Sequence, residues 1–244
     1  MSIIRNKVAL VTGANRGIGF EIARQLGRQG IHVLVGSRSS DLGQAAVAAL
    51  SEDNVECRFV RIDLIDASTI EAAAADIEAQ EQRLDILVNN AGITDSTDGP
   101  PSSANWEAVE RTLRTNFLGT LSVTQTLLPL LRKSAGGRIV NVSSGLGSIE
   151  QNRDPDWEFA QVKYLGYSAS KAALNMLTVQ LAFELRDTGI KVNSADPGFT
   201  ATDLNQHRGH QTVEQGAAEA VLLALLREDG PTGGFFSSAG RVPW

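Results

Sequence analysis

The chain has few of the features that would tie it to an oxidising compartment, a membrane or a nucleic acid. Its 244 residues include one cysteine, Cys57, so no internal disulfide can form, and this usage fits a reducing compartment. No apolar run approaches the ~20 residues that a membrane-spanning helix needs. The formal net charge of -6 argues against a general attraction to nucleic acid or to an anionic membrane surface.

A targeting signal and a metal site are also missing from the sequence. The first residues, MSIIRNKVALVTG, run directly into an apolar strand pattern without a signal-peptide cleavage pattern, which predicts a cytoplasmic protein. His207 and His210 lie close together, but a zinc site needs three or four converging ligands. We therefore expect no metal and place both histidines in a loop that could cover a substrate. Cys57 is expected to be a small buried hydrophobe.

Short apolar runs alternate with longer amphipathic stretches along the whole chain. The runs are apolar on both faces, which predicts a parallel sheet covered by helices. Regular strand–helix alternation without a linker or repeat indicates one α/β domain over residues 1–244, with a doubly wound sheet and helices on both faces. The predicted strands cover 7–11, 31–36, 56–62, 84–90, 137–143 and 190–195, and the predicted helices about 18–29, 41–51, 67–82, 105–132, 166–187 and 213–228.

Two polar, turn-rich stretches interrupt this alternation. They are ITDSTDGPPSSAN (93–105) and GLGSIEQNRDPDWEFAQVKYLG (145–166). Each follows the carboxyl end of a predicted strand, which is where doubly wound sheets bind their ligands. We expect both stretches to be loops that border a binding site.

The segment TGANRGIGF (12–20) opens the first predicted helix directly after the first strand. Glycine lets the backbone turn tightly there and approach a ligand without a Cβ in the way. The free N–H groups and positive dipole end of the helix would then face a pyrophosphate. A glycine-rich turn can also serve only the fold, but strand, turn and helix together favour a Rossmann-type dinucleotide site.

Several motifs together resemble the classical short-chain dehydrogenase/reductase family, in particular its carbonyl-reductase-like members. They are the glycine pattern Thr12-Gly13-x-x-x-Gly17-x-Gly19, the segment NNAG (89–92) and Tyr167-x-x-x-Lys171. The resemblance covers nearly the whole chain in order. It implies a nicotinamide cofactor held by residues that include Gly13, Asn15, Arg16, Gly17, Ile18, Gly19, Asn90, Ala91 and Gly92.

The expected choice of cofactor depends on the residues after the second strand. An NAD site usually places an acid there for the ribose 2′-hydroxyl, whereas this chain reads GSRSS (36–40). Arg38, together with Arg16 in the glycine loop, could bind the 2′-phosphate of NADP(H) through charge-assisted hydrogen bonds, and Ser37 or Ser39 could add a hydroxyl. Both arginines could instead be solvated surface charges. The missing acid makes NADP(H) the expected cofactor.

The family resemblance adds further cofactor contacts. Asp63 matches the adenine-binding aspartate, with Leu64 beside it. The segment DPGFTAT (196–202) matches the family's Pro-Gly segment after the sixth strand. It implies that Phe199 and Thr200 contact the nicotinamide carboxamide and Thr202 the amide or phosphates, with Pro197 and Gly198 shaping the loop.

Tyr167 and Lys171 are the expected catalytic pair. They are four residues apart in a predicted helix and so share a face. A bare tyrosine is a poor base near neutral pH, but a nearby ammonium lowers the pKa of the phenol. The resemblance implies that Ser144 hydrogen-bonds the substrate oxygen, with Ser143 as the alternative. It also implies that Asn116 holds a water in a proton relay toward Lys171.

The chain departs from the family pattern between the serine and the tyrosine. Twenty-two residues (145–166) separate Ser144 from Tyr167, a longer stretch than is usual, with an insertion at about 146–163. Trp157 and Phe159 could line the substrate pocket or simply pack the insertion onto the body. The insertion could also cover the helix through which many family members associate. The chain is therefore expected to be a homo-oligomer, dimer or tetramer, or else a monomer.

These observations predict an NADP(H)-dependent oxidoreductase whose partner is a small carbonyl or alcohol substrate. Reduction of a ketone or aldehyde is expected, with Tyr167 as general acid/base. One alternative is an NAD-dependent alcohol dehydrogenase on the same fold. The other is a nucleotide-sensing protein that kept the fold and lost catalysis.

Overall fold

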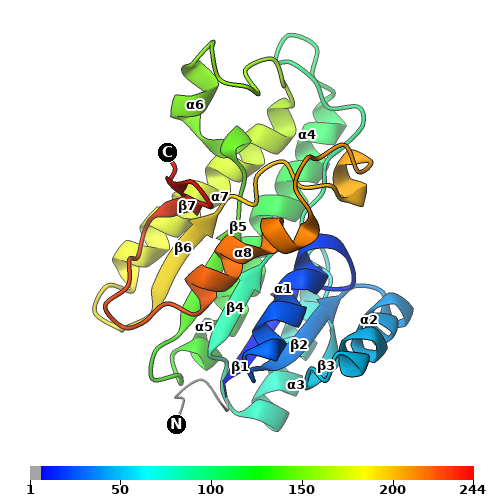
Figure 1. Ribbon diagram of the computed structural model, residues 1–244, viewed down its shortest axis with the longest axis vertical. Helices are drawn as coiled ribbons and strands as arrows, with labels where there is room; N and C mark the ends of the chain where they lie inside the picture. Colours follow the sequence, from blue (N-terminus) through cyan, green and yellow to red (C-terminus); the bar gives the residue numbers. More distant parts are fainter. Residues whose placement is uncertain (1–6) are drawn as a thin grey trace.

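Eight strands form one sheet in the computed structural model, which describes residues 7–244 (Figure 1). Their order is β3-β2-β1-β4-β5-β6-β7-β8, and every neighbouring pair is parallel except β7 with β8. The strands are β1 (Val8–Thr12), β2 (His32–Ser37), β3 (Cys57–Arg61), β4 (Ile86–Asn89), β5 (Arg138–Val142), β6 (Lys191–Ala195), β7 (Phe235–Ser237) and β8 (Gly240–Arg241).

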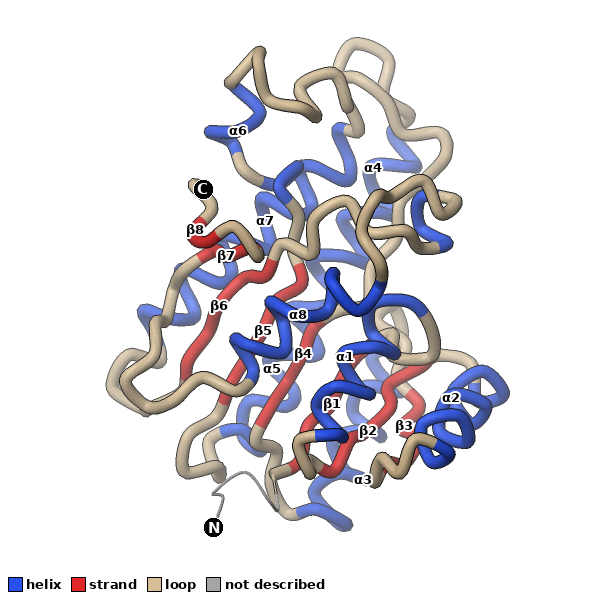
Figure 2. Tube along the Cα trace, viewed as in Figure 1, coloured by secondary structure: helices blue, strands red, loops and turns tan. Residues whose placement is uncertain are grey.

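Helices cover both faces of the sheet, which confirms the predicted doubly wound α/β fold (Figure 2). On one face lie α1 (Gly17–Arg28), α2 (Ser40–Glu52) and α8 (Val213–Ala224), whose buried residues join one core cluster. On the other face lie α3 (Ala67–Glu81), α5 (Thr120–Leu131) and α7 (Leu165–Glu184), which share a second cluster.

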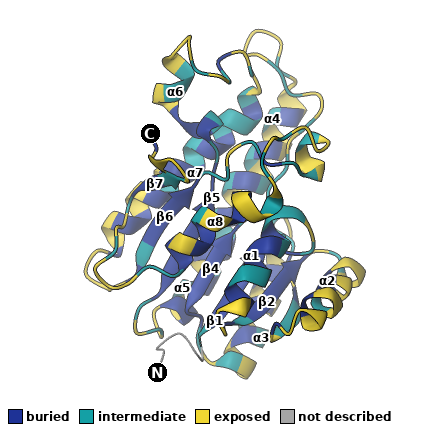
Figure 3. Ribbon diagram, in the orientation of Figure 1, coloured by how far each residue is buried: buried dark blue, intermediate teal, exposed yellow. Residues whose placement is uncertain are grey.

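The strands are apolar on both faces because each face meets a helical layer. In β1, Ala9 and Val11 belong to the first cluster, whereas Val8 and Leu10 belong to the second. This alternation is what a strand side-chain period of two produces when both sides are buried. The central strands are accordingly buried along their length in Figure 3.

The helix predicted over 105–132 is wrong in one respect, because the structure divides it. It begins as α4 (Trp106–Leu113), passes through a π-helical segment (Arg114–Gly119) and continues as α5. A π-helical segment leaves the i→i−4 pattern locally and is frequent at functional sites. Asn116, one of the predicted catalytic residues, lies in this segment.

The end of the chain differs from the sequence prediction. Helix α8 ends at Ala224 rather than near 228, and β7 and β8 lie in a stretch to which no strand was assigned. Phe235 in β7 is fully buried and stacks on Trp244, with ring centroids 5.6 Å apart. The sequence around Phe235 is rich in glycine and serine, so it lacks the apolar pattern from which this short strand could be predicted.

The insertion contains more regular structure than the predicted loop. It holds a 3₁₀ turn (Gly145–Gly147) and α6 (Ile149–Arg153), and Ser148 caps α6 by accepting a hydrogen bond from the Gln151 backbone at 3.1 Å. Figure 1 shows α6 beyond the carboxyl ends of β5 and β6. The insertion leaves an apolar stripe of α7 exposed, formed by Met176, Val179 and Phe183.

Among residues 7–244, no helix combines the length and the apolar character that crossing a bilayer requires.

Candidate active site

A cleft opens at the carboxyl edge of the sheet, where the order of the strands reverses. The chain leaves β1 toward β2 on one side, and β4 flanks β1 on the other. Such a switch point is where doubly wound sheets bind ligands. The cleft has a volume of about 370 Å³ and is lined by residues of the glycine loop, of the strand ends and of α7.

Most of the predicted site residues line this cleft. They are Gly13, Asn15, Arg16, Gly17, Ile18, Gly19, Arg38, Asp63, Leu64, Asn90, Ala91, Gly92, Tyr167, Lys171, Pro197 and Thr202. The structure adds residues that sequence reasoning missed, namely Leu42, Ile62, Ile93, Thr115, Val142, Asp203 and Leu204. Ile62, Ile93 and Val142 stand at or just beyond strand ends, a signal that could have found them. Asp203 and Leu204 have no such local signal.

The glycine loop is shaped by two different constraints. Gly13 and Gly17 have φ angles of +64° and +57°, which L side chains rarely adopt. At Gly19 the constraint is space, since a Cβ would collide with the Asn90 amide and the Gly13 carbonyl. The first turn of α1 therefore lies directly against the strand ends, and its N-cap residue Arg16 makes no side-chain capping bond. The backbone N–H groups at this end are left for an anionic ligand.

The end of β4 holds the glycine loop in place. The Thr12 hydroxyl accepts hydrogen bonds from the backbone N–H groups of Asn90 at 3.0 Å and Ala91 at 3.1 Å. The Asn90 side-chain amide donates to the Thr12 carbonyl at 2.9 Å. The NNAG segment thus fixes the floor of the cleft.

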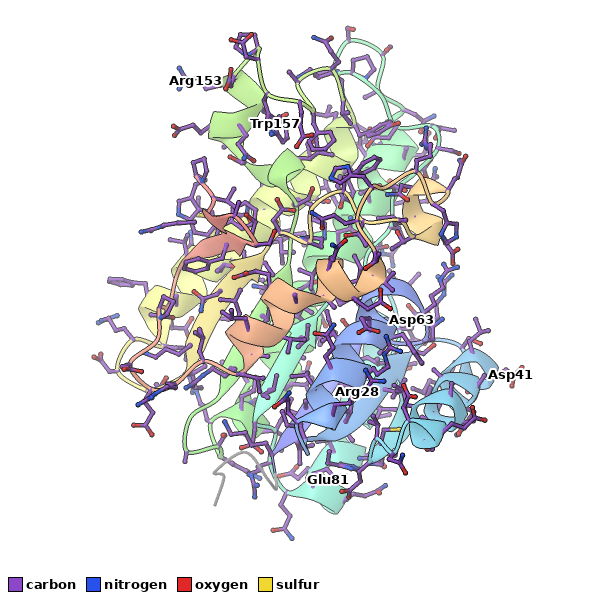
Figure 4. All side chains as sticks on the ribbon, viewed as in Figure 1. Arg28, Asp41, Asp63, Glu81, Arg153 and Trp157 are labelled. Carbon is purple, nitrogen blue, oxygen red and sulfur yellow. The ribbon has the colours of Figure 1, made fainter. Side chains whose placement is uncertain are left out.

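The cleft is cationic where the second strand ends. Arg38 is exposed there and forms no ion pair with any residue of the described chain. Arg16 instead pairs with Asp203 at 2.6 Å. Asp41, the next acid after β2, lies on α2 and does not line the cleft; in Figure 4 it is on the outer side of that helix. Asp63 lines the cleft, and its Oδ1 accepts the Ile65 N–H at 3.2 Å.

Tyr167 and Lys171 lie on one face of α7 and both face the cleft. The Lys171 Nζ lies 5.7 Å from the centre of the Tyr167 ring and donates to the Val142 carbonyl at 2.7 Å. Burial lowers the pKa of Lys171 to about 8, and the Asp196 carboxylate opposes part of this fall. The lysine is therefore anchored to the end of β5 beside the tyrosine.

Ser144 lies beside Tyr167. Its hydroxyl hydrogen-bonds the Tyr167 side chain and also accepts the Leu146 N–H at 3.2 Å. Burial raises the pKa of Tyr167 to about 12, although the bond with Ser144 lowers it. The alternative serine, Ser143, lines the cleft but directs its hydroxyl to the Lys171 carbonyl at 3.5 Å. Ser144 is thus the serine in contact with the tyrosine, and its bond to a substrate oxygen stays a prediction.

Both polar atoms of the Asn116 side chain form hydrogen bonds. Its Nδ2 donates to the Ile93 carbonyl at 2.9 Å and to Ser170 Oγ at 3.0 Å, while its Oδ1 accepts the Ile93 N–H at 2.8 Å. Asn116 does not line the cleft, but a Cβ at Gly92 would lie 3.3 Å from its Oδ1 and 3.7 Å from Lys171 Nζ, so both side chains lie beside Gly92. The structure therefore brings Asn116 near the lysine as a tie between β4, the π-helical segment and α7.

The loop after β6 contributes less to the cleft than predicted. Pro197 and Thr202 line it, whereas Gly198, Phe199 and Thr200 do not. Thr200 is 3% exposed and donates its hydroxyl to the Pro197 carbonyl at 2.9 Å, so it holds the loop's shape. Direct contacts of these three residues with a cofactor stay a prediction.

Aromatic rings join this loop to the insertion. Phe159 packs edge-on against both Trp157 and Phe199, with ring centroids 5.4 and 5.7 Å away. The Phe199 ring in turn lies edge-on to the His210 ring, with centroids 5.9 Å apart. Trp157, labelled in Figure 4, lies beyond the carboxyl edge of the sheet, and its ring contacts Gly145. The aromatic residues of the insertion therefore pack on both loops that flank the tyrosine.

The histidines have partners other than a metal. His207 pairs with Asp203 through Nε2 at 2.8 Å, and His210 contacts Phe199. Among the residues that the structure describes, no three His, Cys, Asp or Glu side chains are grouped to hold a metal ion.

Comparison with known proteins identifies the family. Residues 7–213 match the family model for short chain dehydrogenases. A short-chain dehydrogenase of Penicillium roqueforti, anuI, is 39% identical over 230 residues, which cover 92% of this chain and 90% of that protein. Carbonyl reductase (NADPH) 1 of Sus scrofa is 34% identical, with 98% of this chain and 94% of that protein covered.

Solved structures agree with this assignment. Salutaridine reductase from Papaver somniferum superimposes with a TM-score of 0.81 at 32% identity, over 95% of this chain and 99% of that one. An NADPH-bound carbonyl reductase from chicken fatty liver has a TM-score of 0.83 at 28% identity, over 98% of this chain and 100% of that one. The chain therefore belongs to the short-chain dehydrogenase family.

Proposed function

We propose that this oxidoreductase is an NADP(H)-dependent carbonyl reductase that converts a ketone or aldehyde to an alcohol. The observation that carries the proposal is the place of Tyr167 and Lys171 in the lining of a cleft that also presents Arg38, with Ser144 beside the tyrosine. Relatives named for carbonyl and salutaridine reduction support the direction of the reaction.

The cleft fits a phosphorylated dinucleotide. A Cβ at Gly19 would collide with Asn90 and Gly13, so this glycine lets the first turn of α1 pack against the strand ends. The free N–H groups at the start of α1 would there bind a pyrophosphate. The Arg38 guanidinium has no ionic partner within residues 7–244, and a 2′-phosphate would supply one. Asp63 and Leu64 would border the adenine, and Asn90, Ala91 and Gly92 the central part of the dinucleotide. When bound, NADPH supplies a hydride to the carbonyl carbon.

Tyr167 would donate its phenol proton to the carbonyl oxygen. Burial keeps this phenol protonated at neutral pH, as a general acid requires. Ser144, already bonded to the tyrosine, would hold the same oxygen in place. Lys171, fixed to the Val142 carbonyl, would hold the nicotinamide ribose and stabilise the phenolate left after proton transfer. Asn116 would support proton return toward the lysine from its place beside Gly92.

The first experiment follows cofactor oxidation by absorbance with NADPH and with NADH over a panel of ketones, aldehydes and diketones. Turnover with a strong preference for NADPH is expected. A preference for NADH would favour an NAD-dependent alcohol dehydrogenase, and the arginines would then be surface charges.

The Tyr167→Phe variant separates the enzyme from a nucleotide-sensing protein. It should bind NADPH normally, measured by fluorescence titration, and lose nearly all turnover, because the phenol proton is missing. Unchanged turnover would remove Tyr167 from the reaction. A wild-type chain that binds NADPH without turning over any carbonyl compound would favour the sensing role.

A further inference from the structure

One carboxylate beside the catalytic tyrosine has no role in the mechanism above. Asp196 directly follows β6, and its backbone N–H donates to the Phe236 carbonyl at 2.7 Å. Its Oδ1 accepts the Gly198 N–H at 3.0 Å, and its carboxylate also accepts the Gly145 N–H. We call residues 144–147 the serine loop and residues 196–200 the proline loop. The Asp196 side chain thus bonds both loops at once.

The serine loop makes this connection through glycine. At Gly145 a Cβ would lie 3.2 Å from Asp196 Oδ2 and 3.0 Å from Gln151 Oε1, so a larger residue would push the carboxylate away. Gly145 immediately follows Ser144, whose hydroxyl bonds Tyr167. A shift of the Asp196 carboxylate would therefore displace Gly145 and Ser144, and with them the hydroxyl that bonds Tyr167.

The charges that face Asp196 are few. Lys171 and Tyr167 face it from α7, and Glu158 faces it from the insertion. Asp196 forms no direct ion pair with any described residue. Burial raises the pKa of Asp196, whereas the Gly198 and Gly145 N–H groups and the Lys171 ammonium lower it. These three groups offset part of the effect of burial, which remains the largest influence on the pKa of this carboxyl group.

We propose that Asp196 is a positioning residue whose charge also favours the protonated form of Tyr167. Its side chain ties the serine loop to the proline loop, and its negative charge holds the proton on Tyr167. Reduction needs this proton on the phenol, whereas alcohol oxidation needs the phenolate. Asp196 therefore favours the form of the enzyme that carbonyl reduction needs and should move the pH range of alcohol oxidation upward. The inference rests on the proposed function for its kinetic consequence, and its electrostatic part can be tested without any substrate.

The sign of the effect follows from Coulomb's law. A second negative charge near the phenolate disfavours that phenolate, and Asp196 accordingly raises the pKa of Tyr167 beyond what burial alone does. Neutralising the carboxylate removes this repulsion and should lower the pKa of the phenol. A merely structural tie between the loops would change rates without moving the ionisation of Tyr167.

The composition of the chain allows a direct measurement. It contains two tyrosines, Tyr164 and Tyr167, and Tyr164 is 41% exposed with no capping bond from its side chain. In a Tyr164→Phe background, the near-ultraviolet absorbance of tyrosinate reports Tyr167 alone. In this background Asp196→Asn should start to form tyrosinate about one pH unit lower than the parent. Circular dichroism would mark the pH range over which each variant is folded.

Matched variants separate the effect of the Asp196 charge from other effects of the substitution. Asp196→Glu keeps the charge and Glu158→Gln removes a nearby exposed carboxylate that bonds neither loop, so both should titrate close to the parent. Asp196→Ser serves as a second uncharged variant if Asp196→Asn does not fold. Coinciding titration curves for the parent and the uncharged variant would overturn the proposal.

Kinetics test the consequence for the pH profiles. In Asp196→Asn the alkaline limb of NADPH-dependent reduction and the acid limb of alcohol oxidation should both move to lower pH, by about one unit. A uniform loss of kcat with unmoved limbs would overturn the electrostatic assignment. A shifted tyrosinate titration in a chain without carbonyl turnover would uphold the assignment and refute the proposed function instead.

Discussion

Asp98 accepts a hydrogen bond from the backbone N–H of Tyr167 at 2.9 Å, although the two residues are 69 positions apart. The same carboxylate accepts the Gly166 N–H at 3.1 Å and the Gly99 N–H at 2.8 Å. Helix α7 has no cap of its own, since its N-cap residue Tyr164 makes no side-chain bond. The loop after β4 thus caps the helix that carries the tyrosine.

Removing this cap should loosen the start of α7. Asp98→Ala should lower the free energy of unfolding by about 1–2 kcal/mol and reduce kcat, because Tyr167 lies in the first turn that the carboxylate secures. Urea unfolding and NADPH-dependent turnover measure the two effects. Asp95→Ala is the matched control, because Asp95 bonds Thr97 and Arg111 in the same region but not α7. Equal losses of kcat in both variants would contradict the assignment.

Arg38 should determine the preference for the phosphorylated cofactor. Arg38→Ala is expected to raise KM for NADPH about ten- to hundredfold while changing KM for NADH little, because one charge-assisted bond to the 2′-phosphate is lost. Steady-state kinetics with both cofactors give the ratio. Arg28→Ala, at the far end of α1, controls for loss of positive charge. A parallel rise for NADH would place Arg38 outside the phosphate site.

Asp203 should compete with that phosphate for Arg16. The hydrogen bond with His207 and the charge of Arg16 lower the pKa of Asp203, so the carboxylate is ionised at neutral pH. Asp203→Asn should free Arg16 and tighten NADPH binding several-fold without affecting NADH, as measured by fluorescence titration. His207→Ala leaves the Arg16 pair intact and serves as the control. Weaker NADPH binding in Asp203→Asn would mean that the ion pair closes the loop over the cofactor.

Deprotonation of Lys171 should increase the free energy of unfolding between about pH 8 and pH 10. The folded chain releases the proton of Lys171 at a pKa of about 8, against an ordinary value of 10.5. In this window the unfolded chain binds more protons, so the free energy of unfolding increases with pH, by up to about 1.4 kcal/mol per pH unit. Above pH 10 the raised pKa of Tyr167, about 12, reverses the sign.

The variant Lys171→Met tests this linkage. Its free energy of unfolding, measured by urea titration at several pH values, should lack the rise that the wild type shows between about pH 8 and pH 10. Subtracting the wild-type curve, measured in parallel, removes the contribution of the other titrating groups to the free energy of unfolding. Identical pH dependence in both chains would show that Lys171 titrates normally in the folded state.

The fold could be predicted because both of its signals are local. Apolar runs such as KVALV indicate buried strands, and the glycine loop indicates the first strand–helix turn. The family resemblance pointed to Tyr167 and Lys171, and their four-residue spacing on a helix places them on one face. The π-helical segment around Asn116 could not be predicted, because residues 105–132 have an ordinary helical pattern.

The partners of the site residues could not be predicted for a different reason. Arg16 and Asp203 are 187 positions apart, and Asp98 and Tyr167 are 69 apart. Nothing in the local sequence distinguishes an aspartate that caps a distant helix from one that closes a turn. Asp196 is the first residue of the segment DPGFTAT that matches the family, yet its contact with Gly145 depends on how two loops meet.

The bonds between Thr12, Asn90 and the glycine loop have a thermodynamic consequence. Because Asn90 and Ala91 fix Thr12 in the free protein, the loop loses its conformational entropy when the chain folds rather than when a dinucleotide arrives. Binding then needs little reorganisation of this segment. Part of the affinity for the dinucleotide is therefore supplied in advance by the stability of the fold, so substitutions that weaken the junction of β1 and β4 should weaken binding without touching the ligand.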